Sequence, residues 1–347
     1  MKTELQAVVV IPHLWVQNAN AIASPMSYGF PAITAFTGAA HAIQRKLNEA
    51  GIEVVFNGVG VVCHGAEPQT NRESGYVVRF NLRRDPVGPD GSSAPLVEEG
   101  RMHLDVSLVL GIESGCPVSR HEQRSLAHRI EEQLRAMRVA GGSVLPHPVN
   151  VIRKSARLIE IPGGDEAKTI AFRKLARSLL PGFALVSRHA LLAEHLVALR
   201  AHNSNANSLD ALLDLCALHW TPEPLEEDLG LDDPTTTTAE PTAAKMLWQA
   251  TRRKPGWLVP IPVGYAAISE LYPPGVVKRS RDPAVPFRFV ESVLSLGEWK
   301  SPHRLTGLDE FLWHYDANPD SGLYLVKTLA DTATDSVTDT ATVPVPV

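Results

Sequence analysis

Residues 5–64 decide the fold, and they open with the apolar run AVVVI at 7–11. A run this short and this rich in β-branched residues predicts a buried strand rather than a free-standing helix. Over 34–50, apolar side chains recur every three or four positions, and Gly51 predicts the end of that helix. A second apolar run over 52–63 predicts another strand. Strand, helix and strand together make a crossover unit, in which both strands belong to one sheet.

Three amide side chains, Gln17, Asn18 and Asn20, lie at the exit of the first predicted strand. They offer hydrogen-bond donors and acceptors without charge. One interpretation is that they cap and shape a loop. The other is that they read base edges or ribose 2′-hydroxyls, because an amide can form two hydrogen bonds to an unpaired base.

The composition is that of a globular protein, with 44% hydrophobic and 20% charged residues in a chain of 347. No run of about 18 apolar residues predicts a membrane span, and the first residues do not form a secretory signal. The three cysteines, Cys63, Cys116 and Cys216, are an odd number without a C-x-x-C pair. This pattern is typical of a reduced, cytoplasmic protein, so we expect neither a membrane contact nor a zinc site.

The net charge of −5 is unevenly distributed along the chain. Residues 201–244 contain no Lys or Arg and carry −9, and the residues after 327 carry a further −3. Removing both leaves +7 on the rest of the chain. A modestly basic body with acidic appendages is compatible with binding a polyanion on one face.

Residues 76–84 partly alternate between apolar and polar, which predicts a strand or one arm of a hairpin before the turn-forming residues 88–93. The arginines of this arm either form a solvated face or contact phosphates, whose oxygen pairs suit the guanidinium fork. The polar residues of interest on this arm are Arg79, Asn81, Arg83 and Arg84.

Further along, a central strand is predicted over 102–111, where alternation gives way to a continuous apolar run. Ser119 and Glu122 have the spacing of a capping box. We expect the helix that follows them to run to about Val139.

Two glycines, Gly141 and Gly142, come directly after this predicted helix, between Arg138 and Ser143. Glycines in this place are typical of a helix C-terminal cap. They also allow backbone amides to approach a phosphate closely, with the arginine beside them.

The predicted order of strand, helix, strand, strand and helix is the ferredoxin-like pattern of many RNA-binding modules, which makes the fold class α+β. The two aromatic-rich strand motifs of an RNA-recognition domain are missing, and aromatic residues make up only 6% of the chain. We expect this unit over 1–150 and 251–327, with a helical insertion over 151–250. Residues 221–244 predict an acidic linker, and 328–347 a disordered tail.

Sequence motifs of catalytic sites are absent: there is no G-x-S-x-G elbow and no H-E-x-x-H. Thirteen histidines could supply acid–base groups for RNA cleavage without a metal, and His64, His103 and His147 lie in the predicted core unit. No pairing between histidines and other groups is visible in the sequence. We therefore assign no catalytic residue, no cofactor and no metal.

Six motifs follow one another along about 5–327: QNANAI at 17–22 with GFP at 29–31, VEEGR at 97–101, MRVAGGS at 137–143, LPGFALVSR at 180–188, PGWLVPIP at 255–262 and SPHR at 301–304. In this order they resemble the second Csy family, the Cas-five-type tail subunits of type I-F CRISPR surveillance complexes. The acidic linker and the residues after 327 depart from the family, so nothing is carried over to them.

The resemblance implies a non-catalytic member of the RAMP superfamily, with an RRM-like, ferredoxin-like palm and an inserted helical thumb. Such proteins hold the 5′ handle of the CRISPR RNA and pair with the large Csy subunit, and their thumb meets the adjacent backbone subunit. Target DNA is read by the guide RNA, so contact with DNA is expected to be indirect.

Two sets of candidate residues follow. For RNA binding they are Gln17, Asn18, Asn20, His64, Arg79, Asn81, Arg83, Arg84, Arg101, Arg138, Gly141, Gly142 and Ser143. For partner binding they are Trp299, His303, Arg304, Phe311 and Trp313. Two alternatives stay open: a metal-independent endoribonuclease that processes precursor CRISPR RNA, and a scaffold whose RNA is held entirely by its partners.

Overall fold

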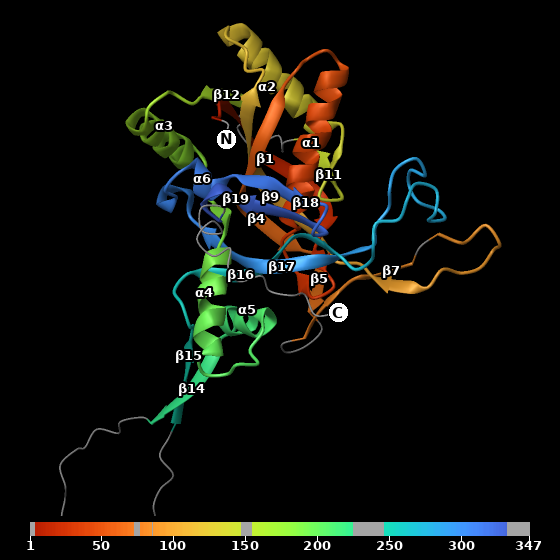
Figure 1. Cartoon of the computed structure of the whole chain (residues 1–347), viewed down its shortest axis with the longest axis vertical. Coiled ribbons are helices and arrows are strands. Elements are labelled where there is room, and N and C mark those ends of the chain that lie inside the picture. The colour runs from red at the N-terminus through yellow and green to blue at the C-terminus, as the bar shows by residue number, and fades with distance from the viewer. Residues whose placement is uncertain (1–3, 73–76, 85, 147–154, 225–245, 332–347) are drawn as a thin grey trace, which may run out of the picture.

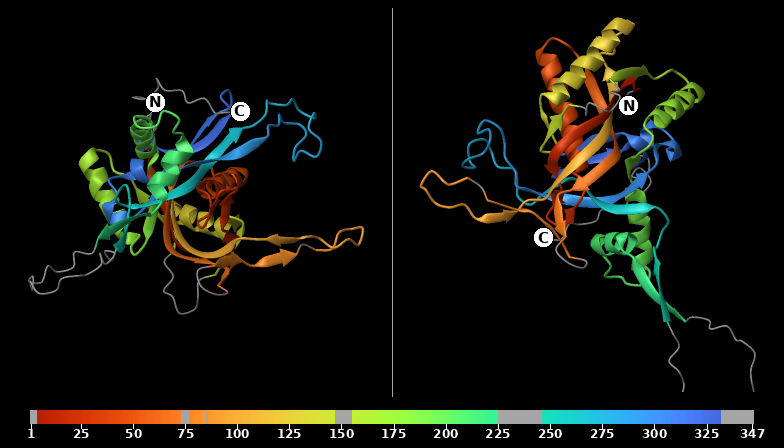
Figure 2. Two further views of the ribbon diagram at one scale, coloured as in Figure 1. Left: turned by 90° about the horizontal axis from the view of Figure 1, so that it is seen from below. Right: turned by 180° about the vertical axis from the view of Figure 1, so that it is seen from behind.

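The computed structural model describes residues 4–72, 77–84, 86–146, 155–224 and 246–331 (Figure 1). One large antiparallel sheet lies at the centre, with helices on both faces. A long hairpin arm and a helical appendage extend from it in different directions (Figure 2). The chain is therefore of the α+β class, as predicted.

The first part of the sheet contains three long strands, β1 (Ala7–Asn20), β4 (Val55–Pro68) and β9 (Arg101–Ser114). β9 lies between β1 and β4 and pairs antiparallel with both. The other side of β1 pairs with β11 (Gly142–Leu145) near its end and with β12 (Arg157–Glu160) near its start. The three strands predicted from apolar runs are thus confirmed, and the strand order is β11–β1–β9–β4.

Two helices, α1 (Ile33–Glu49) and α2 (Arg120–Arg135), cover one face of these strands. Both bury an apolar stripe in the largest core cluster, with Phe36 of α1 and Ile130 of α2 fully buried. α1 ends before Gly51, whose φ of 77° no β-branched residue would adopt easily. Ser119 caps the start of α2, and its hydroxyl accepts a hydrogen bond from the Glu122 amide at 3.2 Å.

The prediction that the second helix runs to Val139 is wrong. α2 ends at Arg135, and the next strand, β10 (Arg138–Val139), forms a tight hairpin with β11. Ala140 and Gly141 make the turn, with φ of 49° and 78°. Positive φ at both central residues is typical of a two-residue hairpin turn, so these glycines do not cap a helix.

The C-terminal strands close the sheet on itself. They are β13 (Phe183–Ser187), β16 (Trp257–Ala267), β17 (Val290–Lys300), β18 (Trp313–Asn318) and β19 (Leu323–Thr328). Pairing runs from β4 through β13, β17, β16 and β19 to β18, where Trp313 pairs back with Val59 of β4. The indole of Trp313 is 1% exposed and donates to the carbonyl of Leu185 at 3.0 Å. This circuit of six strands surrounds one side of the core.

The face of the sheet opposite α1 and α2 is covered by α3 (Asp165–Ser178), η1 (Pro302–Arg304) and α6 (Leu308–Phe311). Phe172 of α3 and Phe311 of α6 pack there against Val8, Val62 and Val109. Burial of these apolar side chains removes this part of the sheet from solvent.

The appendage contains α4 (His189–Arg200), α5 (Ser208–Cys216) and a ribbon of β14 (His219–Pro224) with β15 (Met246–Thr251) (Figures 1 and 2). Leu196 and Leu212 of its helices pack against Leu258 and Leu296 of the sheet in a third cluster.

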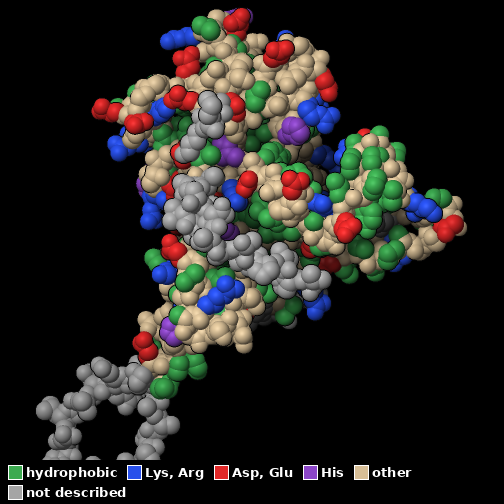
Figure 3. All heavy atoms as spheres, viewed as in Figure 1, with side chains coloured by type: hydrophobic (Ala, Val, Ile, Leu, Met, Phe, Trp, Pro, Cys, Tyr) green, Lys and Arg blue, Asp and Glu red, His purple; other side chains and the backbone are tan. Residues whose placement is uncertain are grey.

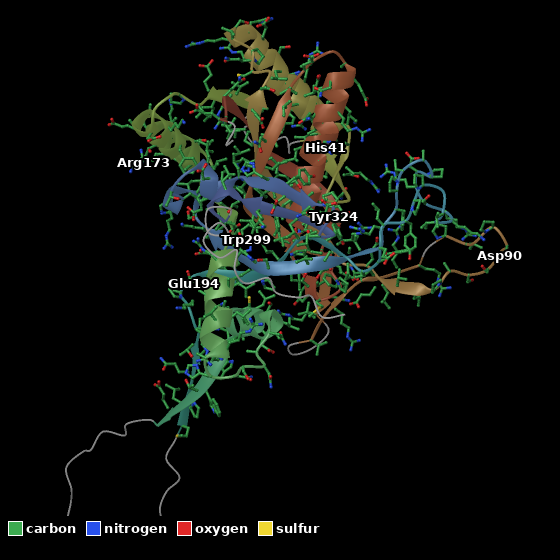
Figure 4. The ribbon with its side chains drawn as sticks, in the orientation of Figure 1. His41, Asp90, Arg173, Glu194, Trp299 and Tyr324 are labelled. Atoms are coloured by element: carbon green, nitrogen blue, oxygen red, sulfur yellow. The ribbon has the colours of Figure 1, made fainter. Side chains whose placement is uncertain are left out.

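The arm between β4 and β9 confirms the predicted hairpin. It pairs β5 (Thr70–Arg72) with β6 (Val78–Phe80), and β7 (Leu82–Arg84) with β8 (Leu96–Glu98). Asp90 lies at its tip (Figure 4). A second small hairpin of β2 (Ile22–Ser24) and β3 (Ser27–Tyr28) follows β1.

The segment predicted as a helical insertion divides into two parts. β12 and β13 pair with β1 and β4, and α3 covers the sheet, so the residues that extend from the sheet are those of α4, α5 and the ribbon. Residues 225–244 of the predicted acidic linker and 332–347 of the predicted tail lie outside the described residues. Among the residues that are described, no helix is both long and apolar enough to span a membrane.

Candidate nucleic-acid interface

A pocket of about 380 Å³ lies where the end of β1, the start of β9, the hairpin of β10 and β11, and the base of the arm meet. We call it the bulge pocket. Nine of the thirteen residues predicted to bind RNA line it: Gln17, Asn18, Asn81, Arg83, Arg101, Arg138, Gly141, Gly142 and Ser143. Its other lining residues, Gln69, Leu82 and Glu99, were not predicted. Five segments that lie far apart in the sequence thus converge on one open hollow.

A bulge in β1 presents the two amides. Between Val16 and Ala19, Gln17 and Asn18 together oppose a single residue of β9, His103. Asn18 adopts a φ of 56°, which asparagine tolerates better than most residues. Its backbone is held by His103 Nδ1, which accepts from the Asn18 amide at 3.2 Å. Both side chains are exposed and, within the described part of the chain, their amides form no hydrogen bond.

The β10–β11 hairpin closes one side of the pocket through a close approach of two backbones. A Cβ on Gly142 would lie 2.6 Å from the Gln17 carbonyl oxygen and 2.7 Å from the Ala19 nitrogen. Gly142 is therefore required so that β11 can lie against the bulge of β1, and it is buried. Gly141 and Ser143 are exposed at the rim, where a ligand can reach them.

Three arginines and one carboxylate set the charge of the pocket. Glu99 accepts hydrogen bonds from Arg83, at 2.9 Å, and from Arg101. These two bonds, with that from Arg83 contributing most, hold the pKa of Glu99 below its usual range. Arg101 also donates to the Asn18 carbonyl at 3.3 Å, and Arg138 is exposed at the rim. With Glu99 ionised, the pocket carries an excess of positive charge.

Four predicted residues are not part of the pocket. Asn20 bonds its own amide to the backbone of Ile22, with Nδ2 donating to the carbonyl at 2.7 Å. Arg79 lies on β6, which pairs with β5 rather than with β7 and β8, and Arg84 is exposed on β7. Because successive residues of a strand point to opposite faces, Arg84 points away from the side that Arg83 presents.

His64, the fourth, belongs to a polar cluster on β1, β4 and β9. Its Nε2 lies 2.6 Å from the Ser107 hydroxyl and its Nδ1 2.5 Å from the Pro181 carbonyl. Its ring stacks on His13, with centroids 4.1 Å apart, and His13 Nδ1 lies 3.0 Å from both carboxylate oxygens of Asp105. The sequence did not predict this cluster, because its members come from three strands that pair only in the fold.

The predicted partner-binding residues have different surroundings. Phe311 and Trp313 are 0% and 1% exposed, so they belong to the core, which corrects their assignment to a partner surface. Trp299 is half-buried between Phe30 and the exposed Trp257. His303 and Arg304 are exposed on η1, as a partner contact requires.

His147, one of the histidines that could supply an acid–base group, lies outside the described residues.

Residues 9–326 match the family model described as CRISPR-associated protein (Cas_Csy2). The chain is also 46% identical over 324 residues to CRISPR-associated protein Csy2 of Pseudomonas aeruginosa (strain UCBPP-PA14). The aligned residues cover 93% of this chain and 95% of that protein. The chain belongs to the Csy2 family. It is therefore a second Csy protein of the type I-F CRISPR system.

The Csy2-family match spans all of the segments that form the bulge pocket. Among the residues that the structure describes, no three His, Cys, Asp or Glu side chains are grouped as metal ligands would be.

Proposed function

We propose that this Csy2-family protein is a non-catalytic subunit of a type I-F CRISPR RNA-guided complex, and that its bulge pocket binds the 5′ handle of the CRISPR RNA. The observation that carries the proposal is the convergence of exposed amides, arginines and a glycine turn on one open, basic hollow. None of these groups is close to another in the sequence except within its own segment.

The pocket offers two kinds of contact. Arg83, Arg101 and Arg138 can neutralise phosphates, and Glu99 holds the first two in place until a phosphate replaces it. The amides of Gln17 and Asn18 can bond base edges or ribose hydroxyls. Phosphate contacts position the RNA, whereas amide contacts distinguish one handle sequence from another.

The fold supports this role. We infer a ferredoxin-like palm, in which the first and third strands are central neighbours, and the strand order β11–β1–β9–β4 with two helices on one face supports it. We assign the thumb to α4, α5 and the β14–β15 ribbon, which extend from the sheet. In the complex this thumb would meet the adjacent backbone subunit.

A second surface fits the large Csy subunit. The loop of 268–289 between β16 and β17 exposes a group of large apolar side chains (Figure 3), which are Ile268, Leu271, Val276, Val285 and Phe289. Monomeric proteins rarely leave such a patch open to solvent. We therefore place the partner contact on this loop, with Trp299, His303 and Arg304 as further candidates, and expect target DNA to be contacted only through the assembled complex.

Site-specific crosslinking tests the RNA site. A photo-reactive residue at Asn18, in the complex assembled with CRISPR RNA, should crosslink to handle nucleotides. The matched control is the same residue at His121, which is exposed at the start of α2, at the opposite end of β9 from Arg101. Crosslinks from Asn18 only to protein subunits would instead favour the scaffold alternative, in which partners hold the RNA.

The alternative function is a metal-independent endoribonuclease, and one observation favours it: His13 and His64 are stacked, with Asp105 and Ser107 as their partners. We propose that these bonds hold the strands together, because both imidazoles are already bonded within the chain. Incubation with precursor CRISPR RNA, with or without divalent metal, should then give no specific product. A specific product that disappears in His64→Ala would replace the proposed function.

A further inference from the structure

A second hollow, of about 810 Å³, lies beside the bulge pocket and shares Arg138 and Gly141 with it. One of its walls is the first half of α1, and the other is one face of β16, β18 and β19. Three tyrosines line it, and none of its lining residues is acidic. We call it the tyrosine trough. Its volume is in the range of sites that hold small planar ligands.

Strand pairing brings the tyrosines to one face. Tyr265 of β16 pairs with Tyr324 of β19, and Tyr324 pairs with Ala317 of β18. Tyr315 lies two residues before Ala317 on β18 and therefore shares its face. Tyr265 and Tyr315 are 45% and 58% exposed, and Tyr324 is half-buried, with its hydroxyl accepting from Arg288 at 3.4 Å. The three tyrosines line the same hollow from one face of these strands, and we call them the platform.

The wall opposite the platform is made of small residues. Ala35, Gly38 and Ala39 lie at helical spacing on one face of α1, and all line the trough. A Cβ on Gly38 would meet no heavy atom within 4 Å. Glycine weakens the interior of a helix, and no neighbouring atom requires a glycine here. The open space beside Gly38 is part of the trough.

We propose that the tyrosine trough stacks unpaired nucleobases of the RNA strand whose phosphates lie in the bulge pocket. This inference rests on the proposed function and names a second part of the same site. Aromatic platforms bind single strands because every base has a π-face. Arg138, at the boundary of the two hollows, is placed to contact the phosphate between a base in the trough and a nucleotide in the bulge pocket.

Charge and continuity favour RNA over a protein segment as the occupant. The one charged side chain of the trough is Arg138, and the trough opens into a pocket with three arginines. A polyanion passing between the two meets no carboxylate in the trough and a single one, Glu99, in the pocket.

The first test fills the trough. Gly38→Leu places a side chain in open space on a helix and improves its helix propensity, so it should not lower the melting temperature of the full-length protein. We expect its affinity for a synthetic handle RNA to fall about 5- to 150-fold, the equivalent of losing one stacked base. Gly38→Ala is the matched control and should bind nearly as the parent does.

The second test pairs a protein change with an RNA change. Tyr315→Ala should weaken binding, whereas Tyr315→Phe, which keeps the ring, should bind as the parent does. A series of handle RNAs, each lacking the base at one position, then locates the stacked base. With the RNA that lacks this base, Tyr315→Ala should weaken binding no further, because the stacking contact is already absent. Trp248→Ala removes an equally exposed aromatic side chain on the ribbon and should have no effect.

Each outcome is decisive. If Gly38→Leu and Tyr315→Ala bind handle RNA as the parent does while Arg138→Ala binds more weakly, RNA stacking in the trough is contradicted and RNA binding in the bulge pocket is supported. If Arg138→Ala also binds as the parent does, RNA binding is contradicted at both places. If the trough variants keep their RNA affinity but no longer copurify with another protein subunit, the occupant is protein and the inference is overturned.

Discussion

The bulge pocket and a second charged group, which we call the Glu310 cluster, use the same side chains in opposite surroundings. In the pocket, Arg83, Arg101 and Arg138 share one carboxylate, Glu99, at an open surface. The Glu310 cluster joins β17 to α4 and α6, and its charged members are Arg188, Lys300, Glu298 and Glu310.

In the Glu310 cluster every charge is compensated. Arg188 lies 2.6 Å from Glu298, and Lys300 lies 2.6 Å from Glu310, which is only 8% exposed. Glu310 also accepts two hydrogen bonds from Thr306, each at 2.9 Å. Burial opposes ionisation of this carboxyl, but the bonds from Lys300 and Thr306 outweigh it and hold the pKa of Glu310 below its usual value.

Burial and charge balance, rather than residue type, therefore separate a stabilising cluster from a binding site. A balanced buried cluster becomes costly when one member is removed. An exposed, unbalanced group adds little to stability and keeps a capacity for an anion. The Glu310 cluster should therefore respond to mutation in unfolding experiments, and the bulge pocket in RNA binding.

The largest expected effect is on stability. Lys300→Met removes the nearest cation from the buried Glu310 carboxylate and leaves it only Arg188, at 3.6 Å. The free energy of unfolding should therefore fall by about 3 kcal/mol. A denaturant titration measures it. Lys168→Met is the matched control: it breaks an exposed pair with Glu4 and should change the free energy of unfolding little. An equal loss of unfolding free energy in the two variants would contradict the distinction between buried and exposed charges.

Gly142→Ala affects both stability and binding. Its Cβ would press on the Gln17 carbonyl and push the β10–β11 hairpin away from β1. We expect a loss of about 1–3 kcal/mol in unfolding free energy, together with weaker handle binding, because the hairpin carries Arg138. Gly163→Ala, where a Cβ meets no heavy atom within 4 Å, should change neither.

Asn18→Ala should act mainly on recognition. Its side chain is exposed at the bulge, but alanine tolerates a φ of 56° less well than asparagine, so we also expect the free energy of unfolding to fall by about 1 kcal/mol. Binding of the cognate handle should weaken by about 1–3 kcal/mol, measured by titration against labelled RNA. A scrambled handle of the same length and charge is the control and should bind both proteins equally. An equal loss for both RNAs would mean that Asn18 does not read sequence.

Acid should remove part of the stability that the Glu310 cluster provides. Because the pKa of Glu310 is lowered in the folded protein, its contribution is present above the pKa of the unfolded state and is lost as the pH falls through the folded value. The melting temperatures of the parent and Glu310→Gln should therefore differ near neutral pH and converge in acid. A constant difference down to about pH 3 would contradict the linkage.

The sequence predicts the first sheet well, because β1, α1 and β9 carry unbroken apolar patterns. It also identifies most of the bulge pocket, since amides, arginines and glycines are unusual residues that stand out locally. It cannot choose between Arg83 and Arg84, because that depends on which face of β7 meets β9. Tyr265, Tyr315 and Tyr324 stay hidden for a similar reason, as only strand pairing brings them together.

Burial of Phe311 and Trp313 is also beyond local pattern. Both lie in a short polar–apolar segment near the C-terminus, and only the closure of β18 onto β4 places Trp313 inside. Likewise β13 is five residues long, and its place between β4 and β17 depends on contacts more than 100 residues apart. Such long-range pairing has no signature within a sequence window.

The most direct test of the RNA site is the salt dependence of handle binding in Arg83→Ala and Arg84→Ala. The two arginines are neighbours on β7, yet only Arg83 lines the bulge pocket. Arg83→Ala should weaken binding of any handle sequence and reduce the slope of log K against log salt by about one unit, whereas Arg84→Ala should keep the parent slope. Equal slopes in both variants and the parent would place the RNA elsewhere and contradict the account.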